Sequence, residues 1–190
     1  AEAAEVAETF EDPDLAALAR LGDGQALMAM GDIQSATARF DSVMLMVSTG
    51  EVGPVVAGVV YCAVILECMQ VFDLIRATEW TEALHGWCED QPDLVPYRGQ
   101  CLVHRSQLQQ AGGDWTSAFA TAVDACDRLA EPPHPALGLA RYQEAELHRL
   151  RGACHAAAVA YAQASARGHD PMPGLALLEL ARGDVDAAAA

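Results

Sequence analysis

The sequence predicts an all-α fold organised as a helical-repeat solenoid, in which antiparallel helix pairs stack side by side. Short turns recur at intervals of 41, 41, 39 and 31 residues, and the five turns are Gly31-Asp32, Phe72-Asp73, Gly113-Asp114, Gly152-Ala153 and Gly183-Asp184. Units of this length built from two helices cannot bury their apolar faces alone, so they stack on their neighbours. No run of β-branched residues alternates with polar ones, and strands are therefore not expected.

A small residue recurs at one position of the repeat. An alanine stands five residues past the start of each turn, at Ala36, Ala77, Ala118, Ala157 and Ala188. Nine residues past the first four turns stand Phe40, Thr81, Ala122 and Tyr161. A small side chain lets two helices approach closely, and a larger one a turn later fills the space to the next pair. We therefore expect the first four alanines to be buried at helix contacts.

Turn and cap signals divide the chain into helix pairs within a single domain, residues 1–190. Residues 1–11 are interpreted as the end of a preceding helix. Asp12 and Pro13 then start a new helix as N-cap and first-turn proline, and Gly31-Asp32 separates that helix from the next. The expected pairs, about four and a half in number, span 12–48, 52–90, 94–130, 135–168 and 172–190.

The stretch Val52–Phe72 is the most apolar in the chain and contains no Lys or Arg. Its uncharged part, between Glu51 and Glu67, has 15 residues, fewer than the roughly 20 that a membrane-spanning helix needs. We interpret it as a buried helix with Pro54 in its first turn, where the missing backbone N–H costs little. Because it is apolar on nearly every side, we expect other helices to cover it.

Strong helix breakers delimit the second half of the chain. Gln91-Pro92-Asp93 interrupts it, and Pro96 starts a helix that stops at Gly112-Gly113. The segment 131–135 holds three prolines within four residues, which excludes helix. A further break, Arg167–Pro173, precedes the last pair.

Composition bounds the class of protein. The formal net charge of −16 and the pI near 4.5 predict repulsion of nucleic acid and of anionic lipid. Apolar residues make up 52%, too many for a disordered acidic chain, so the charge is expected on the surface of a folded protein. The six cysteines form no CxxC pair, which indicates reduced thiols in a cytoplasmic protein. Ala-rich helical sequence at both ends indicates a segment of a longer protein.

The turns resemble those of tetratricopeptide repeats, in which a Gly-Asp or Gly-Asn turn precedes the second helix, with an alanine and then an aromatic residue at these offsets. The departures are Phe72 in place of Gly, Ala153 in place of Asp, and units near 40 residues rather than about 34. Four strings more narrowly resemble the helical-repeat region of large bacterial LuxR-type transcriptional regulators: YCAVILEC, FDLIRATEWTEALHGWCEDQPDLVPYRGQCLVHR, YQEAELHRLRG and PMPGLALLELARGDVDAAAA. The resemblance implies a right-handed superhelix, and DNA binding only by a helix-turn-helix domain C-terminal to the repeats in a parent protein.

No motif supports catalysis, a metal or another cofactor, and none of these is expected. Gly22-Asp23-Gly24 lacks the lysine and the preceding strand of a phosphate-binding loop, so we interpret it as a helix interior or a kink. His104, His148 and His155 could be considered as metal ligands together with Cys101 or Cys154. However, Cys101 and His104 form one isolated i,i+3 pair, and the side chains of the adjacent Cys154 and His155 diverge. No Cys or Ser has an orienting base at a suggestive spacing, so an enzyme is not expected.

Two groups of side chains leave alternatives open. Trp80, Trp87 and Trp115 could pack between helices or contact a ligand. Much of the scarce positive charge lies on two predicted helices, at Arg98, Arg105, Arg141, Arg149 and Arg151. Internal ion pairs would explain these arginines, and so would recognition of an anionic ligand or an acidic partner segment.

The resemblance also implies where a partner would bind, because the first helix of each pair lines a concave groove in tetratricopeptide-like arrays. Counting back from the turns assigns an apolar, Met-rich end to Gln25, Met28, Cys62, Leu66 and Met69. The polar end falls on Val103, Gln107, Gln110, Tyr142, Glu146 and Arg149. Such a groove suits an amphipathic helix, a peptide tail or an elongated small molecule with one polar end.

The expected function is that of a cytoplasmic, non-catalytic sensor or interaction segment of a LuxR-type regulator, recognising a protein segment or small ligand in the groove. No membrane contact and no direct nucleic-acid contact are expected of this segment. The alternative is a stand-alone protein that binds or sequesters small, drug-like molecules. Neighbouring helices or a second copy of the chain, as a homo-oligomer, could equally fill the groove.

Overall fold

The computed structural model describes residues 2–90 and 95–189, and this part of the chain is all-helical. Its eleven helices are α1 Glu2–Phe10, α2 Pro13–Ala29, α3 Ile33–Ser48, α4 Pro54–Gln70, α5 Leu74–Asp90, α6 Val95–Ala111, α7 Trp115–Ala130, α8 Leu137–Leu150, α9 Cys154–Ala166, α10 Gly174–Arg182 and α11 Val185–Ala189. The prediction of an all-α protein is confirmed for these residues, and none of them is in a strand. The predicted break at Gln91-Pro92-Asp93 lies outside the described residues.

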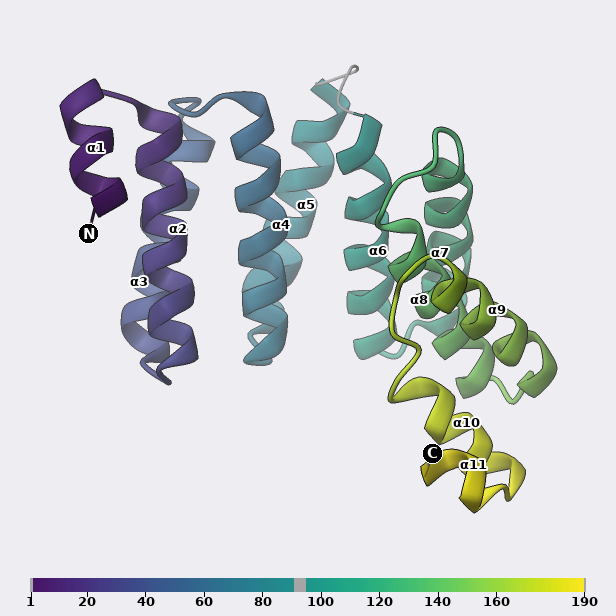
Figure 1. Cartoon of the computed structure of the whole chain (residues 1–190). Coiled ribbons are helices and arrows are strands. Elements are labelled where there is room, and N and C mark those ends of the chain that lie inside the picture. The colour runs from purple at the N-terminus through teal and green to yellow at the C-terminus, as the bar shows by residue number, and fades with distance from the viewer. Residues whose placement is uncertain (1, 91–94, 190) are drawn as a thin grey trace. The chain divides into compact units, whose positions relative to one another are not determined.

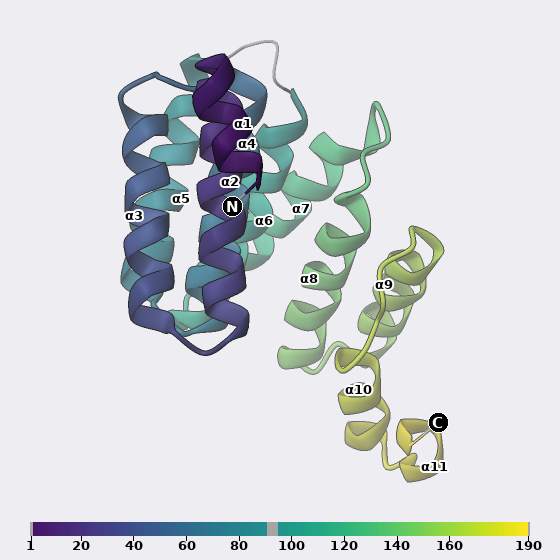
Figure 2. The same ribbon diagram turned by 60° about the vertical axis from the view of Figure 1, so that its left-hand side comes forward.

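The chain forms two compact units, Ala1–Gly86 and Trp87–Ala190, and the division falls near the end of α5. In the first unit α2 and α3 run antiparallel and α4 lies beside α2 (Figures 1 and 2). In the second unit α6 packs on α7, α8 on α9, and α10 on α11. Neighbouring helices therefore pack in pairs.

The helix ends follow the local signals. Asp12 caps α2 by accepting a hydrogen bond from Leu15 N (3.0 Å), and Pro13 and Pro54 occupy first-turn positions of α2 and α4. Gly22-Asp23-Gly24 lies inside α2, as predicted. One boundary differs slightly, since α6 begins at Val95 rather than at Pro96.

The five predicted turns share one backbone geometry. Each places a left-handed residue just past the preceding helix, with φ of +82°, +58°, +85°, +74° and +84° at Gly31, Phe72, Gly113, Gly152 and Gly183. The N–H of this residue and that of the next both donate to carbonyls of the preceding helix, as in Gly113 N to Gln110 O (3.1 Å) and Asp114 N to Gln109 O (2.9 Å). These bonds satisfy carbonyls that a helix end would otherwise leave unpaired.

Phe72 is the non-glycine residue among these five, and its side chain is 83% exposed. A left-handed conformation costs an ordinary residue about 1–2 kcal/mol, and this side chain packs too little to offset that cost. We expect Phe72→Gly to stabilise the protein by about 1 kcal/mol, measured as a higher denaturant midpoint at unchanged slope.

Gly31→Ala is the matched control, because a Cβ there meets no atom within 4 Å and only the backbone conformation is penalised. It should destabilise by about the same amount. An unchanged midpoint for both variants would show that the turn conformation carries no energetic cost.

The repeated alanines are buried, as predicted. Ala36, Ala77, Ala118 and Ala157 have no exposed surface. The residues four positions later are buried too: Phe40, Thr81, Ala122 and Tyr161. Ala188, in the short α11, is only half-buried.

The size of the side chain nine residues past the start of a turn is related to the size of the side chain seven residues before that turn. Where one of the two is large, the other is small. Gly24 faces Phe40 so closely that a Cβ built on the glycine would lie 2.5 Å from the phenyl ring. In the next pair the sizes reverse, to the buried Ile65 and Thr81. The fourth pair returns to a small residue with a large one, Ala145 with Tyr161, in one core cluster.

The third pair is the exception, because Ser106 and Ala122 are both small. The space is filled from the neighbouring pair instead, since Leu147 of α8 packs with Ala118 and Ala122 in one cluster. Ser106 Oγ also donates a hydrogen bond to Ala118 O (2.8 Å), which holds α6 close to α7.

Enlarging Ala118 should therefore disrupt the contact between α7 and its neighbours. Ala118→Leu adds three carbons where Ala122 and Leu147 already fill the space, and overpacking of this kind costs about 1–3 kcal/mol. The matched control is Ala120→Leu on the exposed side of the same helix, which should leave the melting temperature nearly unchanged. Equal melting temperatures for the two variants would contradict the repeat alignment in this pair.

The apolar helix α4 differs from its prediction on one side. Its residues Val60, Val64 and Ile65 are fully buried, but Val59 is 40% exposed and Leu66 is 37% exposed. The expectation that other helices cover α4 all round is therefore wrong for the side that carries Val59 and Leu66. The described contacts of α4 with α2 and α3 leave this side of the helix accessible.

Candidate interaction surfaces

Two hydrogen bonds fix the alignment of α2 and α4 in the first unit. Gly53 N donates to Asp14 Oδ1 (2.6 Å) at one end, and Gln25 Nε2 donates to Glu67 Oε1 (3.2 Å) near the other. The bonded residues are 39 and 42 positions apart, close to the repeat period. The two helices therefore run parallel, with equivalent positions side by side.

This alignment brings most of the predicted apolar binding residues together. We define the α2–α4 face as Leu18, Met28, Val59, Leu66 and Met69. Spacings of seven and three residues place Leu18, Gln25 and Met28 on one side of α2, and Val59, Leu66 and Met69 on one side of α4. Leu18 is 39% exposed, and Met28 and Met69 are half-buried. Gln25 is exposed beside them.

Sequence reasoning missed Leu18 and Val59, although each lies seven residues before a predicted position and therefore on the same side of its helix. It also placed Cys62 on this surface, which is wrong. Cys62 is only 6% exposed, although it lies between Leu66 and Met69 around the helix.

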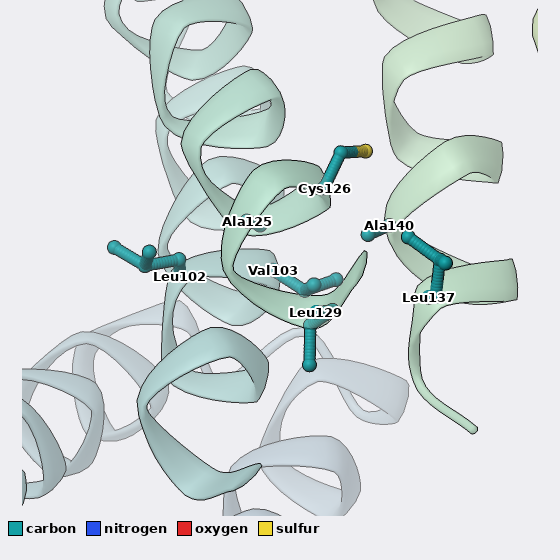
Figure 3. Close-up of a cluster of buried hydrophobic side chains, with 7 residues drawn as sticks. All are labelled: Leu102, Val103, Ala125, Cys126, Leu129, Leu137 and Ala140. Carbon is teal, nitrogen blue, oxygen red and sulfur yellow. The ribbon is translucent and has the colours of Figure 1, made fainter. Parts of the chain in front are cut away.

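In the second unit Val103 is likewise core rather than surface. It is fully buried with Leu102 of α6, Leu129 of α7 and Leu137 of α8, in a cluster completed by Ala125, Cys126 and Ala140 (Figure 3). The expectation that Val103 faces a groove is therefore wrong. The reason is that α6 contacts both α7 and α8, so more of its surface is covered than a two-helix unit requires.

The predicted glutamines lie half-buried at the contact of α6 with α8. Gln143 Nε2 donates to Gln110 Oε1 (2.8 Å) and to Ser106 Oγ (3.2 Å), so Gln110 is held within the protein. The carbonyl oxygens of Gln107 and Gln109 are buried without a hydrogen-bond partner. Gln143, which the sequence did not single out, organises this contact.

The other polar residues predicted for the groove form a closed network. Arg149 donates two hydrogen bonds to Glu146 (2.7 and 3.2 Å), and the Tyr161 hydroxyl donates to the same carboxylate. The Tyr142 ring meets that of Tyr161 edge-on at 5.7 Å. A Cβ built on Gly174 would lie 2.5 Å from the Tyr161 oxygen, so the first residue of α10 approaches this network too closely for a side chain. The network joins three helices.

Electrostatics agree with a structural role for these groups. Burial, followed by the neighbouring Glu146 carboxylate, raises the pKa of the Tyr161 phenol, which therefore stays protonated and donates. Burial also raises the pKa of the Tyr142 phenol. Glu146 and Arg149 thus have partners inside the protein, and a ligand would have to compete with those partners.

Three of the arginines singled out in the sequence have partners within the protein. Arg141 Nη1 lies 2.7 Å from Glu144, and Arg149 pairs with Glu146 as described. The Arg151 guanidinium lies 4.7 Å above the Phe119 ring, a cation–π contact, whereas Arg105 is exposed. The side chain of Arg98 lies outside the described residues.

Each of the three tryptophans keeps part of its side chain accessible to solvent. Trp80 and Trp87 are half-buried, and Trp115 is exposed beside the Asp114 cap. None of the three is a fully buried core residue.

His104 is the most unusual polar side chain in the described residues. It is fully buried, and neither ring nitrogen has a hydrogen-bond partner. Burial lowers the pKa of His104 to about 4. The nearby Gln107 side chain raises this pKa, but by less than burial lowers it, and it forms no hydrogen bond with the ring.

The remaining candidate chemistry finds no assembled site. Within the described residues, no three His, Cys, Asp or Glu side chains gather as metal ligands would. All six cysteines are free of disulfide bonds, and five of them are buried. Burial raises the pKa of Cys68 to about 11 and that of Cys101 to about 12, which opposes thiolate formation at neutral pH.

Comparison of the chain with protein-family models, with curated proteins and with solved structures finds no match. Among the described helices, none combines the length and the apolar character needed to cross a bilayer.

Proposed function

We propose that the chain is a tetratricopeptide-like solenoid, a right-handed superhelix of helix pairs, and that it acts without catalysis as the sensor or interaction segment of a LuxR-type transcriptional regulator. Its role is to recognise a protein segment or small ligand. The observation that carries the proposal is that five turns of one geometry, spaced by 31 to 41 residues, are each followed by an alanine at the same offset. The exposed α2–α4 face supplies the surface for binding.

The surface that we propose for binding contains fewer residues than the groove predicted from the sequence. Of the eleven candidate residues, Gln25, Met28, Leu66 and Met69 lie at or beside the α2–α4 face. Glu146 and Arg149, in contrast, are engaged with each other. We therefore place recognition on the first unit and assign the polar network to the packing of α8, α9 and α10.

The second candidate is a stand-alone protein that binds small apolar molecules on the same face, since exposed aliphatic side chains beside thioethers suit such ligands. Reading the gene past residue 190 separates the two. A helix-turn-helix domain encoded there supports the regulator, and a stop codon at that point supports the stand-alone binder.

The isolated chain is not expected to bind DNA. Its net charge of −16 opposes the neutralisation of phosphates that drives non-specific binding. Titrating a fluorescently labelled duplex at low salt is the most permissive measurement, and we expect no change in anisotropy up to about 100 μM protein. Micromolar binding that weakens with added salt would contradict this expectation.

A further inference from the structure

The α2–α4 face exposes apolar side chains and belongs to a strongly acidic unit. Leu18, Val59 and Leu66 are each more than a third exposed. The half-buried Met28 and Met69 lie one turn past Gln25 and Leu66, respectively. From Leu18 to Met28 the face spans ten residues of helix, or about 15 Å. That length matches about three turns of an α-helix lying along it.

Acidic residues outnumber basic ones in the first unit, which contains this face. Residues 1–86 hold 14 Asp and Glu residues and three arginines, a net charge of −11. Of those arginines, Arg76 pairs with Asp41 (3.4 Å) and Asp73 (3.7 Å). Carboxylates stand at both ends of the face, Asp14 one turn before Leu18 and Glu67 next to Leu66.

From this juxtaposition we infer that the α2–α4 face docks a cationic amphipathic helix, whose apolar side covers Leu18, Val59 and Leu66 while its Lys or Arg residues meet the surrounding carboxylates. This inference rests on the proposed interaction role and names the class of partner. A helix is the form of partner that offers apolar side chains at matching spacing along a 15 Å stripe.

Charge selects this occupant over the others. A second copy of the chain would itself carry a net charge of −16, so electrostatic repulsion opposes self-association through this face. Nucleic acid and anionic lipid are opposed for the same reason. The flexible thioethers of Met28 and Met69 can adapt to different apolar side chains, so the partner's charge pattern matters more than its particular residues.

The probe is a synthetic helical peptide of about 14 residues, with leucines at i, i+3, i+4 and i+7 spacing and lysines elsewhere. Its control replaces every lysine with glutamate. By calorimetry with the 190-residue chain, we expect the lysine peptide to bind at micromolar concentration and more weakly as salt rises, and the glutamate peptide not to bind. Equal binding of the two peptides, or binding of neither, would overturn the inference.

Two variants localise the binding. Leu66→Lys places a charge in the face, whereas Leu45→Lys makes the same change at an exposed position of α3 outside it. We expect Leu66→Lys to weaken binding about tenfold or more and Leu45→Lys to change it less than about threefold. Equal weakening would mean that the peptide responds only to net charge, and the inference would fail. Val59→Lys repeats the test should Leu66→Lys lower the melting temperature.

A dye separates failure of this inference from failure of the proposed function. Nile red reports apolar binding surfaces without any charge preference. If Leu66→Lys abolishes dye binding but the lysine peptide neither binds nor displaces the dye, the face binds small apolar molecules and only the class of partner is wrong. If neither dye nor peptide distinguishes Leu66→Lys from Leu45→Lys, recognition by this face is wrong as well.

Discussion

Replacing Tyr161 by alanine is expected to destabilise the second unit by about 3–5 kcal/mol. The ring is 1% exposed and packs with Ala145, Ala157 and Leu178, so its removal leaves a cavity among three helices. The carboxylate of Glu146 also loses the hydroxyl that donates to it. Denaturant unfolding followed by circular dichroism measures the change.

Tyr161→Phe serves as the matched control, because it removes only the hydroxyl. Glu146 keeps both hydrogen bonds from Arg149, so the expected loss is about 1.5–3 kcal/mol, the value of one hydrogen bond to a charged group. If alanine costs no more than phenylalanine, the ring contributes nothing through packing, and the role assigned to the fourth helix pair is wrong.

Acid is expected to destabilise the protein through His104. Its pKa is about 4 in the folded protein and about 6.5 when the chain unfolds, so the unfolded state binds the proton more readily. The stability associated with neutral His104 is fully present above pH 6.5 and is lost as the pH falls from 6.5 towards 4. At pH 5 the loss is about 2 kcal/mol relative to pH 7.5.

His104→Leu removes this contribution, so its stability should fall less between pH 7.5 and pH 5 than that of the natural protein. His155→Leu makes the same substitution at an exposed position and should leave the pH dependence unchanged. Because the carboxylates are common to all three proteins, the comparison isolates His104. Parallel stability profiles for His104→Leu and the natural protein would show that water or a local rearrangement relieves the cost of protonation.

Helix boundaries could be predicted because their signals are local. A left-handed glycine followed by a capping Asp, as at Gly113-Asp114, needs no information from distant parts of the chain. The burial of Ala36, Ala77 and Ala118 could be predicted for a related reason, since a repeated small residue indicates a repeated close contact.

Surface exposure was harder to predict, because it depends on how neighbouring helices lean over each position. Counting back from a turn identifies a side of a helix, but Cys62 and Leu66 lie on nearly the same side of α4 and differ sixfold in exposure. The Glu146–Arg149 pair is visible as an i,i+3 spacing, whereas the donation from Tyr161 depends on the packing of α9 against α8. These differences arise from tertiary contacts that no single element encodes.

The alternation of small and large side chains between helix pairs means that the helices are not interchangeable parts. If α4 took the place of α2 against α3, Ile65 would occupy the position of Gly24 and face Phe40. Two large side chains would then compete for a space that holds one. The reverse exchange would set Gly24 against Thr81 and leave a void. Although the turns are alike, the first two pairs therefore carry different shapes, and we expect this difference to oppose an exchange of helices between them.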